Sequence, residues 1–194
     1  TLLFLASYLL YNDGIQTVIT LTSVYAKEEL RIGTDTIIST VLMVQFLAFF
    51  GALLLGVCAR FFGAKRVVLA SLVVWTGAVV GAYFLKVGAL WQFYLFAAFI
   101  GIVLGGSQAL SRSLFSHMIP AGQEAEYFSL YEISERGTSW LGTFLFGLTL
   151  QLTTSYRSAL ASLIVFFALG FVLLVLLDVR RAIVEAGNRP PQKV

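Results

Sequence analysis

Ionisable side chains lie inside segments of this chain that are otherwise apolar enough to cross a bilayer. Glu132, Glu135 and Arg136 fall within the run 127–150, and Asp13 lies about halfway along the run 2–25. A charge at membrane depth is costly, so such residues usually face a protein interior or a water-filled path. The chain is therefore a candidate for moving a polar solute or an ion across a membrane.

The first run is interrupted by a polar stretch, Tyr11-Asn12-Asp13-Gly14, with Gln16 one step beyond it. Positions three and four apart are neighbours on a helix, so Asn12, Asp13 and Gln16 share one broad face. That face either lines a cavity that binds substrate or a proton, or it carries buried polar groups that hold helices together.

Small and polar residues recur at helical spacing along one face of the run 90–115: Gly101, Gly105, Gln108 and Arg112. One interpretation is a substrate path that ends in a charge. The alternative is structural, because a glycine pair lets two helices pack closely, and Arg112, near the end of its helix, can extend to the lipid headgroups.

Glu132 and Arg136 are four residues apart, with the acid first, which is the better order for an ion pair on one helix. Glu135 lies on the adjoining face, and Arg112 of the preceding helix could be its partner. A carboxylate in a poorly solvated site is easier to protonate, so Glu135 is a candidate proton carrier. These residues form either an ionic switch or a structural pair.

Composition places the chain among membrane proteins. Of 194 residues, 59% are hydrophobic and 12% are charged, against roughly 25% charged in soluble domains. We expect an all-α membrane protein with six transmembrane helices, because each apolar run suits a span of about 20 residues. The predicted spans are 2–25, 36–59, 67–85, 90–115, 127–150 and 159–177, followed by a disordered tail over 179–194.

The distribution of Lys and Arg predicts the orientation. Seven lie in the connections 60–66 and 116–126 and the tail, against four in the connections on the opposite side. The positive-inside rule then puts the first set, and the C-terminus, in the cytoplasm. Because the chain begins at Thr1 within an apolar run, we also expect it to be part of a longer protein.

Other classes of function have little support in the sequence. Basic residues lack interleaved aromatic residues, so nucleic-acid binding is not indicated. No metalloprotease, nucleophile-elbow or phosphate-loop motif is present, so we expect no enzyme and no cofactor. His117 has no second His or Cys nearby, and no metal site is expected.

Three stretches resemble a known transporter family: GSQALSRSLFSHMIP with the following GQEAEYF, LYEISERGTSWLG, and YNDG in the first run. They are similar to the C-terminal half of major facilitator superfamily transporters. Within that superfamily they look most like the vacuole-effluxer branch, which includes autophagy-related fungal amino-acid effluxers and their bacterial relatives.

The segment 56–66 resembles the loop motif of that superfamily. Gly56, Gly63 and Lys65 match the motif, whereas Arg60 stands where it has Asp and Phe61 where it has Arg. Without the Asp and Arg of the motif, the loop is not expected to form the charged contacts that usually lock it. A role in packing the two helices remains.

The resemblance implies one half, helices seven to twelve, of a transporter built from two six-helix bundles of inverted repeats, with substrate between the bundles. The expected partners are the missing N-terminal half, the lipid bilayer, a small solute and, for an isolated half, a second copy. The expected function is secondary transport of a small polar organic solute, with an amino acid as first guess and a proton as coupling ion. The expected location is a bacterial inner membrane rather than a vacuolar one. The alternative is a membrane scaffold in which the buried charges are structural.

Overall fold

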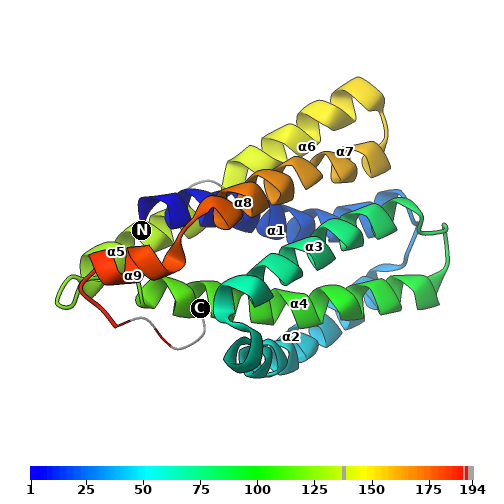
Figure 1. Ribbon diagram of the computed structural model, residues 1–194. Helices are drawn as coiled ribbons and strands as arrows, with labels where there is room; N and C mark the ends of the chain where they lie inside the picture. Colours follow the sequence, from blue (N-terminus) through cyan, green and yellow to red (C-terminus); the bar gives the residue numbers. More distant parts are fainter. Residues whose placement is uncertain (137–138, 190, 192–194) are drawn as a thin grey trace.

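The computed structural model describes residues 1–136, 139–189 and 191, with the side chains of all of these except residues 136 and 139. All regular elements of the described chain are helices, joined by short connections (Figure 1). Its helices are α1 (Leu2–Glu28), α2 (Thr34–Phe62), α3 (Ala64–Tyr83), α4 (Leu90–Ser116), α5 (Glu124–Arg136), α6 (Ser139–Thr153), α7 (Tyr156–Ser162), α8 (Ile164–Leu176) and α9 (Val179–Glu185).

Five stretches of the described chain are long and apolar enough to cross a membrane: α1, α2, α3, α4, and α7 together with α8. The protein is therefore an all-α membrane protein, as the composition predicts. The predicted span 127–150 corresponds to α5 and α6, of 13 and 15 residues, on either side of residues 137–138. A sixth span at this place stays a prediction.

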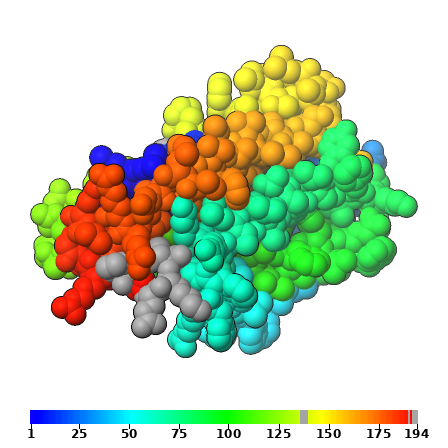
Figure 2. All heavy atoms as spheres, in the orientation of Figure 1, coloured from blue at the N-terminus to red at the C-terminus, as the bar shows by residue number. Residues whose placement is uncertain are grey.

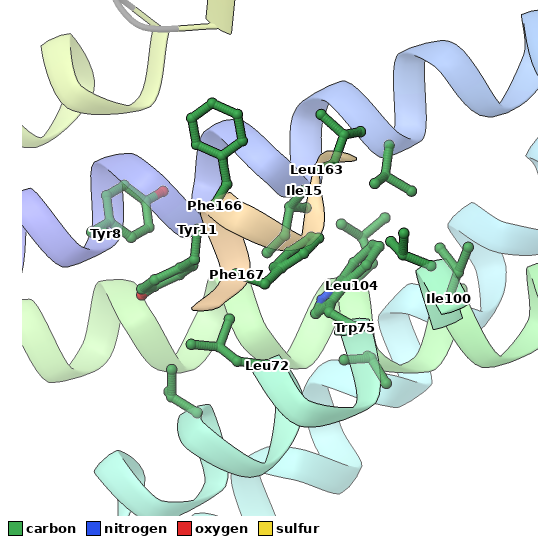
Figure 3. Close-up of a cluster of buried hydrophobic side chains, with 14 of the residues drawn as sticks. Tyr8, Tyr11, Ile15, Leu72, Trp75, Ile100, Leu104, Leu163, Phe166 and Phe167 are labelled. Carbon is green, nitrogen blue, oxygen red and sulfur yellow. The ribbon is translucent and has the colours of Figure 1, made fainter. Parts of the chain in front are cut away.

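The centre of the bundle is an apolar core in which α1 and α8 pack side by side (Figure 3). Trp75 of α3 stacks on Phe167 of α8, with ring centroids 5.9 Å apart, while Tyr11 and Ile15 approach from α1. The space-filling view shows α8, in orange, lying across this face, with α9, in red, beyond its end (Figure 2). The core thus holds the first and last long helices together.

Glycines set the close contact between α2 and α4. A Cβ at Gly51 or Gly105 would overlap a backbone carbonyl of the facing helix, and one at Gly101 would stand 3.0 Å from the Val44 oxygen. The glycine seam considered from the sequence is therefore present. Within α2 itself, only Thr40 and Gly51 are buried, so most of its apolar surface faces outward.

Two cations tie α3 to α7 and α8 at both ends. Lys65, at the start of α3, donates to the carbonyls of Val175 and Leu177 at 3.0 and 2.6 Å. Arg157, at the start of α7, donates to the carbonyls of Tyr83 and Leu85 at 3.2 and 3.1 Å. Each side chain satisfies carbonyls that the last turn of a helix leaves without intrahelical partners. We call these contacts the reciprocal caps.

The tail begins with a helix, α9, where the sequence predicted disorder. Asp178 caps it by accepting a hydrogen bond from the Arg181 backbone amide at 3.0 Å, and Val179, Ala182 and Ile183 are buried. Beyond α9, Asn188 donates to the carbonyls of His117 and Ile119 in the α4–α5 loop. A short apolar stripe and a capping residue are therefore enough to order this part of the tail.

Candidate functional site

Helices α1, α2 and α4 line an open cavity of about 250 Å³, which we call the first cavity. Its polar lining comes from the amides of Gln16, Gln45 and Gln108 and from hydroxyl groups of α1 and α2, Thr22, Ser23 and Thr40. The rest of the lining is apolar, and it carries no Asp, Glu, Lys or Arg among the described residues. The first cavity therefore offers neutral donors and acceptors only.

A second cavity, of about 370 Å³, lies further along α4 towards the α4–α5 loop. Tyr8, Arg112, Tyr131 and Glu135 line it, and Gln108 lines both cavities. The two spaces therefore adjoin at Gln108, on one side of α1 and α4. One is neutral, and the other carries both signs of charge.

Arg112 is the centre of the charged group in the second cavity. Its guanidinium lies 3.2 Å from a carboxylate oxygen of Glu135 and 3.3 Å from one of Glu132, and 5.5 Å from the centre of the Tyr131 ring. The contact between Arg112 and Glu135 considered from the sequence is present. Glu132 also reaches Arg112, while the side chain of its predicted partner Arg136 lies outside the described residues.

Asn12 and Asp13 lie apart from the first cavity. Both are buried, where α1 meets α5 and α6. The Asn12 amide donates to the Glu135 carbonyl at 3.4 Å, and the Asp13 carboxylate faces Gly142 of α6. Gln16 is partly exposed and lines the first cavity. The three residues that share a broad face of α1 are thus divided between two surroundings.

The loop motif has a structural explanation. Gly63 ends α2 and begins α3 with φ at +90°, a conformation that only glycine adopts without strain. Lys65 forms one of the reciprocal caps, and nothing lies within 4 Å of a Cβ built on Gly56.

His117 bonds the Ser113 carbonyl at 2.7 Å. Within the described residues, no three His, Cys, Asp or Glu side chains are grouped to hold a metal.

Several residues that shape the site were not singled out from the sequence. The Ser111 hydroxyl donates to the Ser107 carbonyl at 2.7 Å, so the Tyr11 hydroxyl is the donor in its 2.6 Å bond to Ser111. Gln45 and Thr40 belong to α2, where Gln45 is a single polar residue in an apolar run and Thr40 follows Thr36 and Ser39 near the start of the helix. A periodicity on one helix cannot find Gln45, because the other amides that line the first cavity come from other helices.

Comparison with known proteins assigns the chain to a family. The family model described as vacuole effluxer Atg22-like matches residues 1–187. The chain belongs to this family. The match confirms the resemblance seen in the first, fourth and fifth apolar runs.

The Atg22-like chain also has curated relatives. It is 33% identical over 172 residues to the MFS-type transporter YxiO of Bacillus subtilis, covering 89% of this chain and 40% of that protein. It is 30% identical over 195 residues to autophagy-related protein 22 of Vanderwaltozyma polyspora, and 29% over 194 residues to that of Saccharomyces cerevisiae. These alignments cover 96% and 95% of this chain, but 38% and 37% of the relatives.

The chain thus spans about two fifths of the length of the relatives it matches. No solved structure matches it. Family membership and the apolar helices together show a multi-pass integral membrane protein related to transporters.

Proposed function

We propose that the Atg22-like chain is the C-terminal half of a secondary transporter that moves a small polar solute by alternating access. The observation that carries the proposal is the pair of adjoining cavities, which share Gln108 and follow one side of α1 and α4. In such transporters the substrate binds near the midplane, between two bundles. The N-terminal bundle would close this side.

The outward-facing apolar surface of α2 supports the proposal that a second bundle packs on this helix. Phe46, Phe50 and Leu54 are among its exposed apolar residues, while the glycine seam places the other side of α2 against α4. A partner bundle would extend over α2 and enclose the first cavity.

The charged group around Arg112 suits a contact that forms and breaks during a transport cycle. The Arg112 side chain is 53% exposed, and those of Glu132 and Glu135 are 47% and 23% exposed. Ion pairs with this exposure contribute about 0.2–1 kcal/mol each. Opening the contact is therefore cheap, and a passing solute can replace one of its members.

The linings of the two cavities support a zwitterionic solute such as an amino acid. Glutamine amides both donate and accept hydrogen bonds, so they suit an ammonium or a carboxylate group. Arg112 and Glu135 then offer one charge of each sign.

Substitution of Gln108 in the complete protein tests the proposal. Proteoliposomes would be loaded with members of an amino-acid panel, and counterflow of the labelled compound measured. We expect at least one amino acid to exchange, and Gln108→Leu to raise its KM about tenfold, the cost of one hydrogen bond to a desolvated polar group. Gln108→Asn should fall between the two.

The matched control is Gln151→Leu, because Gln151 is exposed at the end of α6 and lines neither cavity. It should leave KM unchanged. Absence of exchange for every solute tested would remove the transporter proposal and favour the scaffold. An unchanged KM in Gln108→Leu would remove Gln108 from the path.

A further inference from the structure

Four buried oxygen atoms on one side of α1 have no hydrogen-bond partner among the described residues. They are Oδ1 of Asn12, both carboxylate oxygens of Asp13 and Oγ1 of Thr17. The three residues are 0%, 1% and 2% exposed. Leaving one buried acceptor without a partner costs about 1–3 kcal/mol, and native proteins rarely do so. Four such oxygens on neighbouring residues indicate a ligand.

Two of the three side chains, those of Asp13 and Thr17, lie at the contact between α1 and α6. Asp13 and Thr17 are one helical turn apart, and both face Gly142. A Cβ at Gly142 would stand 2.9 Å from Oδ2 of Asp13 and closer still to Oγ1 of Thr17. Glycine at this position therefore keeps side-chain atoms away from both oxygens.

Asn12 precedes Asp13 on α1 and contacts α5. Its amide nitrogen already donates to the Glu135 carbonyl at 3.4 Å, and its amide oxygen is left unpartnered. The described surroundings of Asp13 supply no cationic side chain within salt-bridge distance.

The donor set defines the class of ligand. Carboxylate, hydroxyl and amide oxygens are hard ligands that suit hard cations. The group carries a single formal negative charge, so a monovalent cation neutralises it, whereas a divalent cation would leave a net charge inside the membrane protein. A proton on Asp13 would donate one hydrogen bond, but a metal cation contacts several oxygens at once.

We propose that Asn12, Asp13 and Thr17 form a binding site for Na⁺ where α1 meets α5 and α6. The site is distinct from the solute cavities, which Gln16 and Gln108 line. From the sequence alone, Asp13 was a candidate for binding substrate or a proton, and no metal site was expected; this proposal assigns a metal cation to it instead. Binding of Na⁺ does not depend on transport, whereas a coupling role for the ion rests on the proposed function.

The test is Na⁺ binding by the complete protein, purified in detergent. The melting temperature would be measured against NaCl, with choline chloride holding the ionic strength constant, and bound ²²Na⁺ would be counted directly. A ligand that binds only the folded state raises the melting temperature with its concentration. We expect a saturable rise with Na⁺ that choline does not produce, together with saturable retention of ²²Na⁺.

Variants then assign the binding to this site. Asp13→Asn should abolish both signals, and Thr17→Val should weaken the apparent affinity by about tenfold or more, as the loss of a ligand oxygen predicts. Thr17→Ser keeps the oxygen and should retain binding, which separates loss of the ligand from loss of the fold. Thr76→Val is the matched control, because the Thr76 hydroxyl bonds within α3.

Absence of saturable Na⁺ binding by the unmodified protein would overturn the proposal, and so would binding that Asp13→Asn and Thr17→Val leave unchanged. Na⁺ binding without solute exchange would keep this site and reject the transporter. Exchange without Na⁺ binding would do the reverse.

Discussion

Replacing Glu135 by Gln in the complete protein separates a transport role of this carboxylate from a structural one. The substitution preserves the size and hydrogen-bonding capacity of the side chain and removes its charge. A proton carrier must alternate between charged and neutral forms, so uphill transport should be lost in Glu135→Gln. Exchange of solute down its gradient can survive, because exchange does not require release of the proton.

The structure sets the expected change in stability. Arg112 lies 3.2 Å from Glu135, but its side chain is 53% exposed and it also contacts Glu132 at 3.3 Å. A deeply buried Arg that loses its partner costs about 3–5 kcal/mol, whereas an exposed pair contributes about 0.2–1 kcal/mol. We expect the smaller value, which corresponds to a fall in melting temperature of about 2–4 °C or less.

Three measurements on one preparation decide the question: net uptake, counterflow and melting temperature. Glu132→Gln is the matched control, because it removes the other acidic partner of Arg112. The side chain of Glu132 is 47% exposed. It should retain net uptake. Loss of uptake, counterflow and several kcal/mol of stability together in Glu135→Gln would refute this reasoning and show a structural pair. Full activity of Glu135→Gln in both transport assays would reject the transport role and the structural role alike.

Two further substitutions test the packing of the bundle. Gly142→Ala should destabilise the protein by about 1–3 kcal/mol, because the added methyl group would overlap the Thr17 hydroxyl. Its control is Gly147→Ala, where the added methyl group has open space. This variant should be neutral or stabilising by up to about 1 kcal/mol. An equal thermal shift in the two would contradict the close contact between α1 and α6. Lys65→Met should cost about 1–2 kcal/mol through its two lost hydrogen bonds, and the exposed Arg66→Met should change the melting temperature little. Equal stability of these two variants would show that the cap is weak.

The helical membrane class could be predicted from the sequence because it depends only on long apolar runs. The partner of Arg112 was found because few charges lie at this depth, so the choices were limited. The separation of Asn12 and Asp13 from Gln16 could not be predicted. All three share an arc of α1, and only the positions of α2, α4 and α6 divide that arc.

Gln45 shows a second limit of periodicity. On α2 it is one polar residue in an apolar run, and the amides that face the same cavity, Gln16 and Gln108, come from two other helices. Helix α9 is different, because its evidence was in the sequence. Asp178 precedes Val179, Ala182 and Ile183 in the spacing of a capped amphipathic turn, although basic residues and prolines dominate the tail.

The reciprocal caps have a consequence for how this protein is made. The carbonyls that accept hydrogen bonds from Lys65 come 110 and 112 residues later in the chain. Arg157, which binds the carbonyls of Tyr83 and Leu85 at and just beyond the end of α3, follows them by more than 70 residues. During synthesis α3 therefore enters the membrane before either cap can form. Its packing on α2 and α4 can precede the caps, but a chain that stops before α8 would lack the contacts that join α3 to the last apolar helix.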